Sequence, residues 1–233
     1  MKTTGVVLAL QRYVSPDITP APPAATWADI SRYKNHGTIT GATWVRLPSR
    51  LWVLTLTDSA NVITLPACSA LNNIAPVTYL AWINPTSDGG GAAGRIFHKS
   101  TAAASNLGTR IYLSGTTIVF TVEGATDLVA TTAAAAYTLN NWQFVALTWT
   151  GGVAYLNATL YNNAALVAWN AGASNNGVAP FDSNALYPQL IGNSGAGTRA
   201  FVGSLVLCRI HKVILSPEQI AQIFQAERGW FGV

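Results

Sequence analysis

Charged side chains are scarce in this chain. They make up 9% of its 233 residues, although half of the residues are hydrophobic. Soluble domains usually carry about a quarter charged residues, so the polar surface must come from Thr, Ser and Asn, as is typical of proteins that pack against neighbours. The 13 Lys and Arg residues are scattered singly and give a net charge of +4, whereas nucleic-acid binding proteins concentrate theirs in a basic stripe. Nucleic acid is therefore not an expected partner.

Cysteine and histidine are also rare, and neither forms a recognisable metal or disulfide pattern. Cys68 and Cys208 are too few for a disulfide framework, although the sequence allows a single bridge between them. None of the histidines has the spacing of a zinc motif. The sequence therefore predicts no zinc site at His36, His98 or His211 and leaves the bridge open.

Long apolar runs are absent. A membrane-spanning helix needs about 18 or more consecutive apolar residues, and no segment approaches that length. The first ten residues hold one lysine and an apolar stretch of only six residues, which is shorter than the core of a signal peptide, and no cleavage site follows it. We therefore expect neither a membrane anchor nor a signal peptide.

Short apolar and β-branched runs alternate with turn residues along most of the chain, which predicts about a dozen strands. Residues 16–26 form a proline-rich connector that fits neither a helix nor the interior of a sheet. One helix is expected at the end, because the segment Ser216-Pro217-Glu218-Gln219 is a capping box that precedes an apolar stripe. The sequence thus predicts a single all-β domain over residues 1–233, a two-sheet antiparallel β-sandwich or jelly roll with one short C-terminal helix.

The clearest single element is the segment 141–161, in which two apolar runs flank Gly151-Gly152. A two-residue hairpin loop needs positive φ, which glycine supplies without steric cost. Such a loop would pair Leu147 with Leu156. Alternation along the strands then gives one wholly apolar core face and one uncharged aromatic face.

The aromatic face of this hairpin has three interpretations. It could stack on a sugar ring, contact a partner protein, or pack beneath a loop or the terminal helix. The residues predicted for carbohydrate or partner binding are Trp142, Phe144, Tyr155, Asn157 and Tyr161.

Six short motifs follow one another over nearly the whole chain. No single one is specific, but their order and spacing together are. They are Asp29-Ile30-Ser31 with Asn35-His36-Gly37, Thr57-Asp58-Ser59-Ala60-Asn61-Val62-Ile63, Ala81-Trp82-Ile83-Asn84-Pro85, Trp142-Gln143-Phe144-Val145-Ala146, Gly203-Ser204-Leu205, and Leu215-Ser216-Pro217-Glu218-Gln219-Ile220.

In this order, the motifs resemble those of the concanavalin A-like, laminin-G-like jelly rolls, including those found in phage virion-associated proteins. The resemblance implies a two-sheet sandwich that commonly binds glycans or proteins, often with calcium, and sometimes cleaves polysaccharides. It does not imply one function.

Two departures from the family pattern remove charge. Where members often carry acidic residues after Gly-x-Ile, this chain has Val206 and Leu207, which we interpret as an assembly interface. The second departure lies in the motif at 57–63, whose usual acidic and glycine residues are reduced to Asp58-Ser59 and Asn61.

Calcium is the one cofactor to consider. It takes six to eight oxygen ligands, and the best available are Asp29, Asp58 and Asn61. The alternative at each aspartate is an Asx-turn, which the sequence favours.

Catalysis finds little support. A glycosidase needs two carboxyl groups that flank the scissile bond, and only Glu123 and Asp127 lie close together on an expected strand and turn. The Glu-x-Asp-x-x-Glu signature of related glucanases is absent. Loop carboxylates usually cap turns, so no catalytic residue is assigned.

These observations favour a non-catalytic binding or assembly module. The specific hypothesis is a virion surface or decoration protein, assembled in the host cytoplasm, that contacts copies of itself and other virion proteins. The alternatives are a lectin-like module that binds glycans through the aromatic face, and a polysaccharide hydrolase or lyase.

Overall fold

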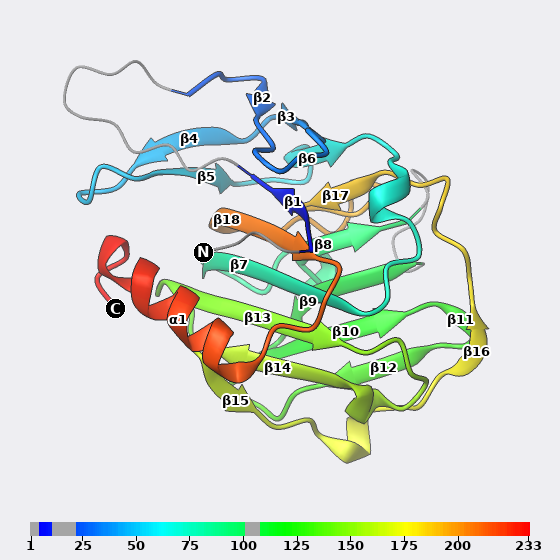
Figure 1. Ribbon diagram of the computed structural model, residues 1–233. Helices are drawn as coiled ribbons and strands as arrows, with labels where there is room; N and C mark the ends of the chain where they lie inside the picture. The colour runs from blue at the N-terminus through cyan, green and yellow to red at the C-terminus, as the bar shows by residue number, and fades with distance from the viewer. Residues whose placement is uncertain (1–4, 11–21, 101–107) are drawn as a thin grey trace.

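Almost all of the regular structure is β-strand, arranged in two large antiparallel sheets (Figure 1). The computed structural model describes residues 5–10, 22–100 and 108–233. In this part of the chain there is a single α-helix, at the C-terminus, and no helix is long and apolar enough to cross a membrane. The two-sheet sandwich with one short terminal helix is confirmed. The connector expected over 16–26 lies outside the described residues as far as residue 21.

The first sheet contains eight strands. In spatial order they are β15 (Ala165–Val167), β14 (Ala158–Asn162), β13 (Gln143–Trp149), β7 (Val77–Pro85), β18 (Gly203–His211), β5 (Trp52–Leu56) and β4 (Thr43–Arg46), with β1 (Val6–Ala9) also paired to β18.

The second sheet also contains eight strands. Their order is β12 (Leu128–Thr131), β10 (Thr117–Val122), β9 (Thr109–Ser114), β8 (Arg95–Lys99), β17 (Gln189–Ile191), β6 (Val62–Leu65), β3 (Gly37–Thr40) and β2 (Thr26–Trp27). A small sheet joins β11 (Gly124–Thr126) to β16 (Val178–Phe181). Short 3-10 helices are η1 (Ser69–Leu71), η2 (Gly90–Ala92), η3 (Tyr155–Asn157), η4 (Ala171–Ala173) and η5 (Arg228–Trp230).

The core lies between the two sheets, where aromatic side chains of one sheet meet those of the other. The Trp149 ring of β13 lies 5.8 Å from the Phe120 ring of β10. The Tyr79 ring of β7 lies 5.3 Å from the Phe97 ring of β8. Alternation along each strand therefore directs every second side chain into the sandwich, as expected for packed antiparallel sheets.

The hairpin of β13 and β14 forms, but the expected register is wrong. Leu147 pairs with Leu160 instead of Leu156, because the connection spans residues 150–157 and includes η3. The shift is four residues, an even number, so the strand residues keep the faces that were assigned to them. Leu156 leaves the core and becomes exposed.

The pair Val206 and Leu207 is not a surface feature, which corrects its interpretation as an assembly interface. Their exposed fractions are 0% and 5%, because β18 is flanked by β7 on one side and by β5 and β1 on the other. The register against β7 shifts between Val206 and Arg209. Leu207 adopts a φ of 53°, so the apolar pair marks a bulge inside the sheet.

Both cysteines are free thiols, so the bridge that the sequence left open is not formed. Cys208 is fully buried in β18, and burial raises the pKa of its thiol. Cys68 is partly buried just before η1. Cys208 therefore acts as a small apolar side chain of the core.

The terminal helix α1 (Pro217–Glu227) begins as predicted. The Ser216 hydroxyl accepts from the Gln219 N–H at 3.3 Å, and the Gln219 side chain accepts from the Ser216 N–H at 2.9 Å. This reciprocal capping box satisfies two backbone donors at the helix start. The apolar stripe faces inward as expected, through the buried side chains Ile220, Ile223 and Phe224.

One tryptophan connects α1 to the outer face of the first sheet. The Trp82 ring of β7 stacks on Phe231 at 4.0 Å and on Phe224 at 5.8 Å. Its indole N–H donates to Glu227 at 2.8 Å, and Glu227 forms an ion pair with Arg209 of β18. The helix therefore covers this face of the sheet, and both apolar and polar contacts hold it there.

Candidate functional site

The aromatic face predicted for ligands is covered over much of its length by α1. Phe144 has no exposed surface, and its ring lies 5.5 Å from Trp82 and 6.1 Å from Phe224. Tyr161 is only 9% exposed. For Phe144 the structure supports the third interpretation, packing beneath the terminal helix, because its ring lies against Phe224 of α1.

Trp142 remains partly exposed, but it lies at the opposite end of β13 from Tyr155 and Asn157. Its ring lies 4.8 Å from Phe231, near the C-terminal end of the chain. The seven residues of β13 lie between Trp142 and the loop that carries Tyr155, which corresponds to roughly 20 Å at about 3.3 Å per residue. The five predicted residues therefore do not form one platform.

Tyr155 and Asn157 do lie together, in η3 at the far end of β13. Asn157 closes this loop: its side-chain oxygen accepts from the Ala154 N–H at 3.0 Å, and its carbonyl accepts from the Thr150 N–H at 3.1 Å. The role of Asn157 is therefore to shape the loop, while Tyr155 is half-buried and packs against the edge of the core.

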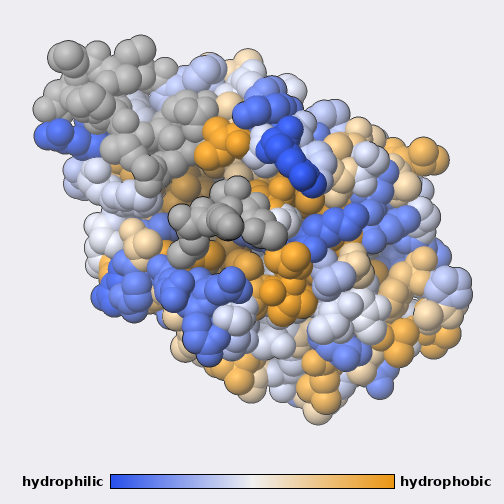
Figure 2. All heavy atoms as spheres, in the orientation of Figure 1, coloured by the Kyte–Doolittle hydropathy of each residue, from blue (hydrophilic) through white to orange (hydrophobic). Residues whose placement is uncertain are grey.

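An exposed apolar surface lies beside η3, where the loop 150–157 meets β16. Figure 2 shows apolar atoms along the lower right edge, over the region where these two segments lie in Figure 1. We call this surface the end patch. It consists of Val153, Leu156 and Val178, whose exposed fractions are 40%, 69% and 50%.

Hydrogen bonds fix the end patch. The Gly177 N–H donates to the Val153 carbonyl at 2.8 Å, and the Tyr155 N–H donates to Asn176 Oδ1 at 3.1 Å. The loop and β16 are thus tied to each other, and the apolar side chains between them are presented on a backbone with defined geometry.

Sequence reasoning missed the end patch because it treated Gly151-Gly152 as a complete loop. That assumption made Leu156 a strand residue in the core. One signal pointed the other way: Asn157 is a poor strand former, yet it stood in the middle of the expected strand.

Asp29 acts as the centre of a turn. It is 1% exposed, and its carboxylate accepts from the backbone N–H groups of Ala9, Ser31 and Asn35 at 2.8–2.9 Å. The Ser31 hydroxyl also donates to it. The structure supports the Asx-turn alternative here, since both carboxylate oxygens already accept hydrogen bonds.

Asp58 and Asn61 form a second, separate turn between β5 and β6. Asp58 Oδ1 accepts from the Ala60 N–H at 2.7 Å and from Asn61 Nδ2 at 3.1 Å. Among residues 5–10, 22–100 and 108–233, no three His, Cys, Asp or Glu side chains lie close enough to hold a metal ion.

Glu123 and Asp127 also have structural contacts. Glu123 accepts from the Gly108 N–H. Asp127 forms an ion pair with Arg110 at 3.6 Å and accepts from the Gly124 N–H at 3.2 Å. Each carboxylate therefore holds the backbone near β11.

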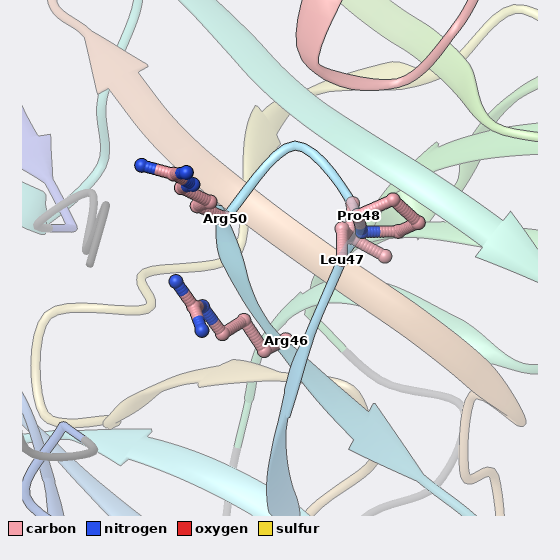
Figure 3. Close-up of a pocket in the computed structure, with 4 residues that line it drawn as sticks. All are labelled: Arg46, Leu47, Pro48 and Arg50. Carbon is pink, nitrogen blue, oxygen red and sulfur yellow. The ribbon is translucent and has the colours of Figure 1, made fainter. Parts of the chain in front are cut away.

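An open hollow of about 380 Å³ lies at the turn between β4 and β5. Figure 3 shows Arg46 and Arg50 extending to the same side of this hairpin, with Leu47 and Pro48 at its tip. Both arginines already have interaction partners within the chain. The hollow lies on one hairpin and contains no carboxylate among its described lining residues.

Solved structures of toxin binding domains share this fold. The binding domain of Paraclostridial Mosquitocidal Protein 1 matches 95% of this chain over 52% of its own, with a TM-score of 0.63 and 15% identity. The binding domain of botulinum neurotoxin DC, solved with rat synaptotagmin II, matches 95% over 51%, with a TM-score of 0.63 and 13% identity. The chain therefore spans about half the length of these domains.

An enzyme also contains the fold. A Trypanosoma rangeli sialidase, solved with the inhibitor DANA, matches 94% of this chain over 32% of its own, with a TM-score of 0.62 and 14% identity. At such identities the likeness shows the fold alone, which is one that proteins use for binding domains. No curated protein matches the chain.

The family is identified from the sequence itself. Residues 57–221 match the model of the concanavalin A-like lectin/glucanases superfamily. This range is well over half of the chain and includes the end patch, the terminal helix start and most strands of both sheets. The chain therefore belongs to the concanavalin A-like lectin/glucanase superfamily.

Proposed function

We propose that this chain is a non-catalytic binding and assembly module whose contact surface is the end patch. The observation that carries the proposal is a group of three exposed apolar side chains on a hydrogen-bonded loop and strand. The candidate catalytic carboxylates support it as well, because Glu123 and Asp127 are engaged in backbone and arginine contacts.

The end patch suits contact with a protein. Fully burying one Val or Leu side chain contributes about 1.5–3 kcal/mol, and each 1.4 kcal/mol changes affinity about tenfold. None of its members is charged, so contact between two copies at this surface buries no charged group of the patch. We therefore propose a second copy of the chain as the first partner.

The biological setting we propose is the surface of a virus particle, where the chain would be a structural or decoration protein that contacts its own copies and other virion proteins. The scarcity of charged residues supports this setting. Charged side chains keep a free protein surface soluble, and a surface that is permanently covered by neighbouring proteins does not need them. The mass of the native assembly tests it. A particle that holds many copies is expected, and a free monomer that binds no virus particle would contradict it.

The end patch is tested by substitution. Leu156→Asp should weaken self-association at least about tenfold, because it places a charge in an apolar contact. Multi-angle light scattering over a concentration series measures the change. The matched control is Leu186→Asp, which makes the same change at an 87% exposed leucine on a loop that Asn73 holds through Asn184.

Two results would reject the end patch as the contact surface. One is a wild-type chain that stays monomeric at every concentration. The other is an equal loss of association in both variants, which would mean that charge acts through general solubility. Circular dichroism of each variant confirms that the sandwich is retained.

A glycan-binding function is the second candidate, and Trp142 is the residue that favours it. Its indole is partly exposed beside Phe231, and the neighbouring Asn141 is exposed. An aromatic ring with adjacent amide groups can stack on a pyranose while the amides hydrogen-bond its hydroxyls. Trp142→Ala should abolish any signal on a glycan array, while Tyr155→Ala, at the other end of β13, should retain it. An array with no signal for the wild-type chain would eliminate this function.

A further inference from the structure

One buried side chain joins the turn between β5 and β6 to the segment that follows β17. Asn193 is 1% exposed, and its Nδ2 donates to the carbonyl oxygens of Ser59 at 2.8 Å and Asn61 at 3.0 Å. Its Oδ1 accepts from the N–H groups of Ser194 at 2.8 Å and Arg199 at 3.2 Å. Both ends of the amide are therefore fully used.

These contacts fix the orientation of the amide. A reversed Asn193 would direct its NH₂ group at the two N–H donors of Ser194 and Arg199, and its oxygen at two carbonyl oxygens. Neither arrangement forms a hydrogen bond. The nitrogen of Asn193 must therefore face the Ser59 and Asn61 carbonyls. They belong to the turn 57–61 between β5 and β6, which we call the rim.

Two further side-chain oxygens of this rim also accept hydrogen bonds from the chain. Asp58 Oδ1 accepts from the Ala60 N–H and from Asn61 Nδ2, and Asn61 Oδ1 accepts from the Thr57 N–H at 2.6 Å. Calcium needs six to eight oxygen ligands. The residues present do not fit a calcium site, because the turn 57–61 holds one carboxylate, Asp58, and no three His, Cys, Asp or Glu side chains of the described residues lie close enough to hold a metal ion.

We infer that the Asn193 amide nitrogen takes the position that a cation would take in this rim. Two carbonyls two residues apart in one turn converge on this single point, as they would around a metal ion. The amide supplies two N–H donors there without a net charge. The rim is organised by the chain itself, so its stability does not depend on calcium.

This inference concerns metal response and stability, so it stands whether or not the end patch binds a partner. Asn193→Ala removes the hydrogen-bond donors of the Ser59 and Asn61 carbonyls. Asn61 is 2% exposed, so its carbonyl loses this hydrogen bond inside the protein. Asn193→Asp also removes the donors, but it adds a carboxylate facing the same two carbonyl oxygens. That substitution surrounds the position with oxygen atoms and adds a negative charge, which favours a cation there.

Melting temperatures in millimolar calcium and in a chelator test the inference with the full chain. We expect no difference for the wild-type chain. Asn193→Ala should melt about 5–10 °C lower in both conditions. Asn193→Asp should melt lower in the chelator and regain several degrees in calcium. Asn175→Ala, which truncates an exposed side chain, is the control and should melt like the wild-type chain.

Each arm can overturn the inference. A wild-type chain stabilised by calcium would show that the rim binds the ion after all. An Asn193→Ala variant that melts like the control would show that the amide does not hold the rim. An Asn193→Asp variant that is destabilised but indifferent to calcium would show that the position is not equivalent to that of a cation.

Discussion

His211 is 8% exposed in β18, and neither of its ring nitrogens has a hydrogen-bond partner among the described residues. Burial, and then the nearby positive charge of Arg209, lower the pKa of the imidazole to about 4. The side chain is therefore neutral at pH 7 and becomes charged only in acid, where burial leaves it little contact with water.

The sign of the resulting pH dependence follows from linkage. In the unfolded chain the His211 pKa returns to about 6.5, so between pH 6.5 and pH 4 the unfolded state binds more protons than the folded state. Stability is fully present above pH 6.5 and decreases as the pH falls toward 4. Between pH 7.5 and pH 5 the loss should be about 2 kcal/mol.

His211→Gln should remove this component, because glutamine does not titrate. Urea unfolding of both proteins at pH 7.5 and pH 5 measures the difference. The carboxylates contribute equally to both proteins, so only the difference between their pH profiles is attributed to His211. Parallel profiles would contradict the prediction.

At single residues the sequence predicted local hydrogen bonds better than it predicted partners that lie far away along the chain. It favoured Asx-turns at Asp29 and Asp58, and both carboxylates do accept turn N–H groups. Asn193 was not singled out, because nothing in its neighbouring residues reveals that a turn more than 130 positions earlier supplies its partners.

Among the elements, α1 shows how a local signal and a distant contact combine. The capping box at Ser216–Gln219 is a local pattern, and it correctly placed the start of the helix. The attachment of the helix depends on Glu227, which accepts from the Trp82 indole and pairs with Arg209. The side chains of this ion pair are 17% and 13% exposed.

Glu227→Ala should therefore destabilise the fold strongly. It leaves Arg209 largely buried without its carboxylate and the Trp82 N–H without its acceptor, which costs about 3 kcal/mol. For a domain of this size the melting temperature should fall by about 6–12 °C.

Differential scanning calorimetry provides the measurement for this change. The control is Gln222→Ala, an exposed position on the same helix, which should leave the melting temperature nearly unchanged. A small and equal effect of both substitutions would mean that aromatic stacking alone attaches the helix.

The β13–β14 hairpin shows where an element escapes prediction. The strands and their faces followed from alternation, which depends only on neighbouring residues. The loop length did not, because Gly151-Gly152 satisfies a two-residue turn and the beginning of a longer one equally well. Asn157 stabilises the longer loop, because its side-chain oxygen accepts from the Ala154 N–H. This contact exists only once the longer loop has formed.

At the level of the whole molecule, the sandwich could be predicted and its exposed surface could not. Short apolar runs separated by turn residues predicted a two-layer sandwich, because each apolar strand face needs a second sheet or a helix to cover it. Exposure depends on which strands become neighbours. Val206 and Leu207 were expected outside and lie inside, whereas Leu156 was expected inside and lies outside.

The burial of Cys208 provides a built-in chemical reporter. Its thiol lies in β18, between β7 on one side and β1 and β5 on the other, so a thiol-reactive dye can reach it only when the first sheet opens. Cys68 is partly accessible and can be replaced by serine beforehand. The labelling rate of Cys208 then measures how often the sandwich opens under native conditions.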